Sequence, residues 1–177
     1  QDLYEPSPFS INENNVALSA DRHLSYNEIV ANLIYEYIEK ENKYLMLHRN
    51  KKENDLNEGK WIGVGGKFEE KESPEECLVR EVKEETGLTL TKYKLRCMVT
   101  FVSDKWETEH MYVFTATEFE GELKECNEGT LQWIDKDKIL ELPTWEGDKF
   151  FLEKMQKQEE FFTMRVEYKG DKLVNCK

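Results

Sequence analysis

The most constraining feature of the sequence is a helix whose two ends can both be recognised. Ser73 is a natural N-cap, Pro74 suits the first helical position, and Glu76 completes a capping box. Gly87 supplies a C-terminal stop, because glycine readily adopts the left-handed conformation that often ends a helix. The segment 74–86 is therefore predicted to be helical, and the fold has to accommodate it.

The same helix concentrates acid on one side. Residues three and four apart share a helix face, so Glu81, Glu84 and Glu85 project together. Carboxylates this close repel each other unless a cation lies among them, and their hard oxygens suit Mg²⁺, with Mn²⁺ as an alternative. Taken alone, the pattern also fits a solvated acidic surface. The adjoining face is apolar and is predicted to anchor the helix on a sheet through Leu78, Val79 and Val82.

Outside this helix the chain is mostly β-rich. Apolar and β-branched runs predict two hairpins, the second turning at Gly170–Asp171. Apolar spacing predicts a further helix over 147–158, and Asp135 or Asp137 is expected to cap a short helix ending at Leu142. The element order therefore predicts a mixed α/β fold. The predicted strands are 29–38, 44–47, 95–103, 110–119, 130–134, 161–168 and 173–176.

Length and charge narrow the function classes. A chain of 177 residues suits one domain, predicted over residues 24–177, with residues 1–23 as a flexible leader or expression remnant. The chain carries 25 Lys and Arg against 37 Asp and Glu, a formal net charge of -12. This charge argues against nucleic acid and membrane partners, which are bound through excess positive charge. A phosphate-bearing ligand would then need metal ions to supply positive charge.

The cysteines and the hydropathy of the chain predict its cellular compartment. The four cysteines lie too far apart for a Cys-x-x-Cys pair and are too few for a disulfide scaffold. No apolar run reaches the length of a transmembrane helix, and no signal peptide is recognisable. We expect reduced thiols in a cytoplasmic protein.

A longer motif surrounds the acidic helix. Gly66 is followed by five residues, then Glu72, then seven residues, then Arg-Glu-Val-Lys-Glu-Glu-Thr-Gly-Leu over residues 80–88. Every defined position resembles the Nudix box. The resemblance implies a Nudix hydrolase, an enzyme that uses divalent metal and water to cleave a diphosphate linkage in nucleoside diphosphates joined to another group. It also implies the Nudix fold, a single α/β domain with a mixed β-sheet sandwiched between helices.

The resemblance also assigns roles to residues. It implies that Glu81, Glu84 and Glu85 hold metal together with the Gly65 carbonyl, that Arg80 orients the glutamates, and that Glu72 is an accessory group. Lys67 is placed to meet a phosphate oxygen. The general base differs between members of the family, being a box glutamate in some and a later carboxylate in others. Glu128 occupies the later position and is the candidate there for the base and for a further metal ligand; alternatively, it is an exposed loop charge. Three other acids could compete for that position: Glu120, Glu122 and Glu125.

Two segments bear on the substrate. The glycines of Trp61–Lys67 mark a close backbone approach or a sharp turn, and this segment resembles the W-x-G-x-G-G-K entry of the 8-oxo-dGTP diphosphatase branch. The segments 131–134 and 142–148 resemble that branch's second signature, which implies that Trp145 stacks on the purine and Asp148 hydrogen-bonds its edge. Alternatively, Trp145 is a core aromatic and Asp148 caps a helix.

The chain departs from the animal enzymes of this branch at two positions. Ile62 replaces an asparagine that contacts the base, and Gly147 replaces the first of two adjacent aspartates. The arrangement is more similar to bacterial, mutator-type (MutT-like) members. We therefore expect a monomeric Mg²⁺-dependent hydrolase that converts oxidised purine nucleoside triphosphates to monophosphate and pyrophosphate, sanitising the pool of DNA precursors. The alternatives are a Nudix hydrolase of ADP-ribose or of a dinucleoside polyphosphate, and a non-catalytic Nudix binding module.

Overall fold

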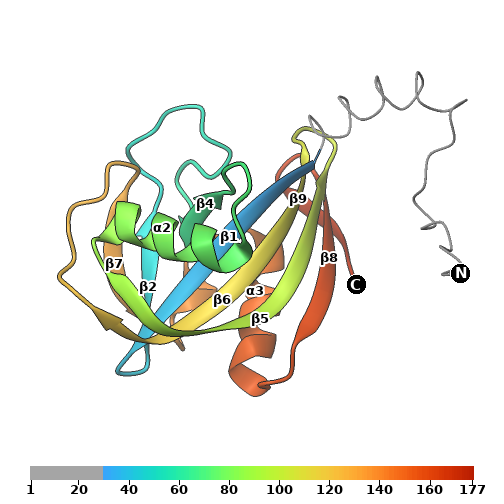
Figure 1. The fold of residues 1–177 in the computed structure, drawn as a ribbon. Helices are drawn as coiled ribbons and strands as arrows, with labels where there is room; N and C mark the ends of the chain where they lie inside the picture. Colours follow the sequence, from blue (N-terminus) through green and yellow to red (C-terminus); the bar gives the residue numbers. More distant parts are fainter. Residues whose placement is uncertain (1–29) are drawn as a thin grey trace, which may run out of the picture.

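A mixed β-sheet is the centre of the molecule (Figure 1). The structure, a computed structural model, describes residues 30–177, so the predicted leader at residues 1–23 lies outside the described residues. The strands within that range are β1 (Val30–Lys40), β2 (Lys43–His48), β3 (Trp61–Ile62), β4 (Val64–Lys67), β5 (Thr89–Ser103), β6 (Thr108–Glu120), β7 (Thr130–Asp135), β8 (Phe162–Lys169) and β9 (Lys172–Cys176). Their order is β3-β2-β1-β6-β5-β8-β9, with β4 on β1 and β7 on β2.

Two α-helices cover the two faces of this sheet. The pairs β1–β6 and β5–β8 are parallel and the other strand pairs are antiparallel. Helix α2 (Pro74–Thr86) packs on one face and α3 (Glu146–Lys157) on the other (Figure 1). This arrangement confirms the predicted α/β fold. Within residues 30–177 no helix is long and apolar enough to cross a membrane.

Helix α2 has the predicted bounds and caps. The Ser73 hydroxyl accepts a hydrogen bond from the Glu76 amide at 3.1 Å, and the Glu76 carboxylate accepts one from the Ser73 amide at 2.8 Å. Gly87 closes the helix at a φ of 80°, and its amide donates to the Lys83 carbonyl at 3.0 Å. Local signals alone therefore define this element.

Two local predictions were wrong. Asp135 ends β7, and the short helix after it is a 3-10 turn (Ile139–Glu141) that begins at Lys138 without a side-chain cap. Strand β5 begins at Thr89, six residues before the predicted Leu95, because its polar first part pairs with the far end of β6. That pairing stabilises a segment with too few apolar residues to indicate a strand by itself.

The sheet separates two apolar layers. On the α2 side Leu78 and Val82 pack with Ile34 and Ile38 of β1. The α3 side is richer in aromatic side chains, which include Tyr37, Tyr44, Phe101, Trp145, Phe151 and Tyr168. Alternation along β1 explains this division, because successive side chains of a strand point to opposite faces.

Glu36 interrupts the apolar layer under α2. It lies on β1 between Ile34 and Ile38, is fully buried, and neither carboxylate oxygen has a hydrogen-bond partner among the described residues. Burial, and next the charge of Glu39, raises its pKa well above the ordinary value. The unfolded chain therefore releases this proton at lower pH than the folded protein does. The contribution of protonated Glu36 to the free energy of unfolding is therefore fully present below the ordinary carboxyl pKa. It is lost as pH rises toward the raised pKa of the folded state.

Glu36→Gln is expected to stabilise the protein increasingly as pH rises. The variant keeps the shape but has no charge to bury, so its advantage in the free energy of unfolding should grow by up to about 1.4 kcal/mol per pH unit above the ordinary carboxyl pKa. Urea unfolding at pH 5.5 and pH 8 measures this difference. The exposed Glu118→Gln on β6 is the control. An equal effect of Glu36→Gln at both pH values would contradict the assignment.

Candidate active site

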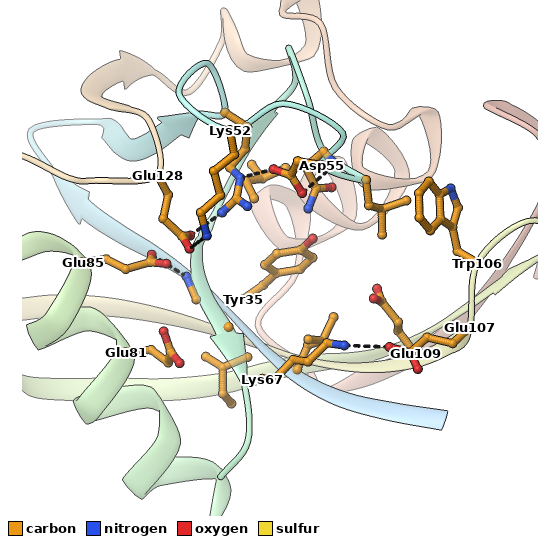
Figure 2. Close-up of a pocket in the computed structure, with 18 of the residues that line it drawn as sticks. Tyr35, Lys52, Asp55, Lys67, Glu81, Glu85, Trp106, Glu107, Glu109 and Glu128 are labelled. Atoms are coloured by element: carbon orange, nitrogen blue, oxygen red, sulfur yellow. Dashed lines mark hydrogen bonds and ion pairs between the residues drawn. The ribbon is translucent and has the colours of Figure 1, made fainter. Parts of the chain in front are cut away.

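A cavity of about 740 Å³ opens where the acidic helix meets the sheet (Figure 2). Its walls come from β1, β3, β4 and α2, from the β2–β3 loop, from the β5–β6 turn and the start of β6, and from the loop before β7. Chain segments far apart in sequence therefore converge on one space. Of the predicted site residues, the cavity is lined by Gly65, Lys67, Glu81, Glu85 and Glu128.

Glycines in β4 let the acids of α2 reach this cavity. A Cβ on Gly66 would lie 2.6 Å from the carboxyl carbon of Glu81, and one on Gly65 would overlap the carbonyl oxygen of Ile34. The Gly65 amide donates to Glu85 at 3.2 Å. The close approach predicted for this segment is thus confirmed, whereas the sharp turn is absent, because Gly65 and Gly66 lie in a strand paired with β1.

Arg80 gathers the neighbouring carboxylates. Its guanidinium binds both oxygens of Glu72, at 2.6 and 2.9 Å, and also contacts Glu81 at 2.7 Å and Glu84 at 3.2 Å. A further N–H donates to the Lys67 carbonyl at 3.2 Å. The planar guanidinium has enough donors to hold these groups at once. The predicted orienting position of Arg80 therefore agrees with its contacts.

The carboxyls that remain beside the cavity repel one another. Glu85 is 8% exposed, and burial first, then the neighbouring Glu128, raises its pKa to about 9. Burial also raises the pKa of Glu81. A divalent cation would relieve this repulsion, and the donors are the hard oxygens such a cation prefers. The residues fit a Mg²⁺ or Mn²⁺ ion by chemistry, although among residues 30–177 they do not form a preassembled cluster of three ligands.

Two basic residues of the β2–β3 loop hold Glu128. Arg49 donates to one of its oxygens, and Lys52 donates to the other at 2.6 Å. Arg49 also binds Asp55 at 2.6 Å, which fixes the loop against the cavity. The hydrogen bond from Lys52 and the positive charges of Lys52 and Arg49 lower the pKa of Glu128 despite its partial burial. The loop thus places one ionised carboxylate beside the buried Glu85.

The competing acids lie differently. Glu125 is exposed and pairs with Lys51 at 3.2 Å. Glu120 and Glu122 are exposed and do not line the cavity. Glu128 is therefore the member of this group whose place fits the predicted role.

The substrate-binding candidates are divided. Lys67 lines the cavity and pairs with Glu107 at 2.7 Å. Trp145 is 4% exposed, packs edge-on against Phe101 and Tyr168, and donates its indole N–H to the Asn57 side-chain oxygen at 2.8 Å.

Asp148 is also buried. Burial and the charge of Glu109 raise its pKa to about 7. Neither Trp145 nor Asp148 is part of the cavity wall, although Trp145 hydrogen-bonds to Asn57, which is. Their predicted contacts with the base stay predictions.

Sequence motifs did not reveal the other cavity residues, which include Tyr35, Arg49, Asn57, Trp106 and Glu109. They come from four separate segments and form no local pattern. A sequence signal did exist for Glu109. It alternates along β6 with the buried Met111 and Val113, so its side chain lies on the inward face of the strand. A charged residue at an inward strand position is unusual and can indicate function.

Comparison with known proteins decides the family. The NUDIX domain model matches residues 30–155, most of the chain. The chain belongs to the Nudix family. An uncharacterized Nudix hydrolase of Bacillus subtilis is 32% identical over 139 residues, covering 76% of this chain and 82% of the relative. The oxidized purine nucleoside triphosphate hydrolase of Danio rerio is 33% identical over 111 residues, covering 62% and 71%.

Solved Nudix structures agree with this assignment. A mutator MutT protein from Bacillus halodurans superposes with a TM-score of 0.74 at 29% identity, covering 83% of this chain and 96% of the other. The Nudix fold is therefore confirmed. Nudix hydrolases act on phosphoanhydride bonds of small nucleotide substrates and generally use divalent metal ions.

Proposed function

We propose that this Nudix hydrolase cleaves oxidised purine nucleoside triphosphates of the 8-oxo-dGTP type to monophosphate and pyrophosphate. The observation that carries the proposal is the cavity with the carboxylates of Glu81, Glu85 and Glu128 at one end and Trp106 and Glu109 at the other (Figure 2). The similarity to the oxidized purine nucleoside triphosphate hydrolase of Danio rerio supports this substrate class. The proposed setting is a cytoplasmic monomer that acts on the nucleotide pool.

In the proposed hydrolysis, one group of residues holds the metal and another orients the metal-binding carboxylates. Glu81, Glu84, Glu85, Glu128 and the Gly65 carbonyl are the proposed holders of Mg²⁺, with Mn²⁺ able to replace it. When bound, the metal would activate water and offset charge on the phosphate oxygens. Arg80 orients the α2 carboxylates through its contacts with Glu72, Glu81 and Glu84.

Two further groups act on the substrate. We assign the neighbouring carboxylates of Glu85 and Glu128 to accept the proton of the attacking water. We assign Lys67 to a phosphate oxygen, for which it would exchange its exposed pair with Glu107.

Steady-state kinetics with Mg²⁺ tests the substrate class. The compounds are 8-oxo-dGTP, dGTP, 8-oxo-GTP, dCTP, ADP-ribose and diadenosine tetraphosphate. We expect 8-oxo-dGTP to give the highest kcat/KM. A lead for ADP-ribose or the dinucleotide would replace the proposed substrate within the same family chemistry. Absence of metal-dependent turnover with every compound would favour a non-catalytic binding module.

A further inference from the structure

The two ends of the cavity differ in chemistry. Glu81 and Glu85 stand at the α2 end, while Glu109 and Trp106 lie on the opposite side (Figure 2). If the phosphates are bound at the carboxylates of α2, as the proposed function requires, the base has to occupy the side of Glu109. The polar groups on that side then decide which base is accepted.

Glu109 is a buried carboxyl that faces the cavity. It is 7% exposed and lies on the inward side of β6. Lys67 is the positively charged group that acts to lower the pKa of Glu109, but its ammonium group donates a hydrogen bond to Glu107 and not to Glu109. No hydrogen bond or ion pair to the Glu109 carboxyl is formed by residues 30–177. Burial raises its pKa to about 7. Because an unpaired buried carboxyl is costly, hydrogen-bond donors on a ligand would stabilise it.

Asn57 presents the opposite hydrogen-bonding character. The indole of Trp145 can only donate, so its 2.8 Å bond to Asn57 identifies the amide oxygen and directs it toward α3. The Asn57 amino group is then left to donate elsewhere. Asn57 lines the cavity on the β2–β3 loop. Trp145 therefore acts on this wall as a positioning residue.

The carboxylate of Glu109, which accepts hydrogen bonds, and the amino group of Asn57, which donates them, together suit a guanine-type base. The Watson–Crick edge of guanine offers two adjacent N–H donors and one carbonyl oxygen, and 8-oxoguanine keeps this edge. A carboxylate can accept both N–H groups in parallel, as it does from arginine. Adenine and cytosine place a ring nitrogen acceptor beside their amino group, which would repel the carboxylate.

We propose that Glu109 determines specificity by accepting two hydrogen bonds from a guanine-type base, while Asn57, held by Trp145, donates to the base carbonyl. The inference rests on the proposed function for the position of the phosphates. It goes beyond that function in assigning base selection to a strand residue, Glu109, that lies outside the Nudix box and outside the segment 142–148.

Glu109→Gln tests this assignment by two separate readouts. The first is the Kd of dGMP, 8-oxo-dGMP and dCMP by calorimetry, and the second is kcat/KM for dGTP, 8-oxo-dGTP and dCTP. For the guanine compounds we expect Kd to rise and kcat/KM to fall by about 10- to 100-fold. This is the range for the loss of a hydrogen bond to a charged group. The dCMP and dCTP values should change less than threefold. The exposed Glu118→Gln on the same strand is the matched control.

Trp145→Phe tests the positioning role. It keeps an aromatic ring but removes the indole N–H, so KM for dGTP should rise by a larger factor than KM for dCTP. An equal change for guanine and cytosine compounds in Glu109→Gln, or no change, would overturn the inference. So would wild-type protein that binds dGMP no better than dCMP. Loss of the proposed function alone would instead appear as absent turnover with the guanine preference in binding intact.

Discussion

Glu85→Gln is expected to lower kcat by about a thousand-fold, equivalent to about 4 kcal/mol of barrier. Glu85 combines burial, the Gly65 amide bond and the neighbouring Glu128, so it is the carboxylate most dependent on a cation for its charge. A glutamine offers a neutral oxygen and cannot share a proton with Glu128. Steady-state hydrolysis of the best nucleotide with saturating Mg²⁺ measures the loss.

The same substitution should stabilise the metal-free protein. The raised pKa of Glu85 shows that its charge opposes folding, so the Tm of Glu85→Gln should exceed that of the wild type in EDTA. Added Mg²⁺ should raise the wild-type Tm more than that of the variant. Glu75→Gln, on the exposed side of the first turn of α2, should change neither activity nor Tm shift. Full activity in Glu85→Gln would refute the assigned site.

Arg80→Ala is expected to lower kcat about 10- to 100-fold and to weaken Mg²⁺ activation by a similar factor. Removing the guanidinium leaves Glu72, Glu81 and Glu84 without their shared partner. The carboxylates then spread apart and have to be gathered again before a cation can bind. Initial rates across a Mg²⁺ titration give both quantities.

Arg80→Lys should restore only part of this loss, because a lysine keeps the charge but cannot bind both oxygens of Glu72 in parallel. Arg165→Ala is a suitable control, since that side chain is half exposed and forms an ion pair with Glu167 of the same strand, away from the cavity. If Mg²⁺ activation were unchanged in Arg80→Ala, Arg80 would hold the helix surface rather than the metal site.

Local signals explain what the sequence could predict. Ser73, Glu76 and Gly87 act within one or two helical turns, so the bounds of α2 and the face of its acids follow from spacing alone. The glycines of β4 predict a close backbone approach by their residue type alone, whereas the groups they approach, Ile34 of β1 and Glu81 of α2, are brought there by the tertiary structure. The helix therefore required no knowledge of the tertiary structure, and the partners of the glycines did.

The far wall of the cavity could not be predicted in the same way. Asn57 and Glu109 are 52 positions apart, and only the strand order β2-β1-β6 brings their elements to one cavity. The family resemblance of the segment 142–148 predicts that Trp145 stacks on the base, whereas the burial of Trp145 against Phe101 and Tyr168 depends on packing between α3 and the sheet. Such placements arise from tertiary pairing and leave no periodic trace in the sequence.

The products of hydrolysis test the central claim most directly. Wild-type protein would be incubated with 8-oxo-dGTP and Mg²⁺, and the phosphorus-containing products identified by NMR, with EDTA as the control. Our account predicts equal amounts of the monophosphate and pyrophosphate, and no reaction in EDTA. Formation of the diphosphate with orthophosphate, or turnover that persists in EDTA, would contradict metal-dependent pyrophosphohydrolysis at the α2 carboxylates.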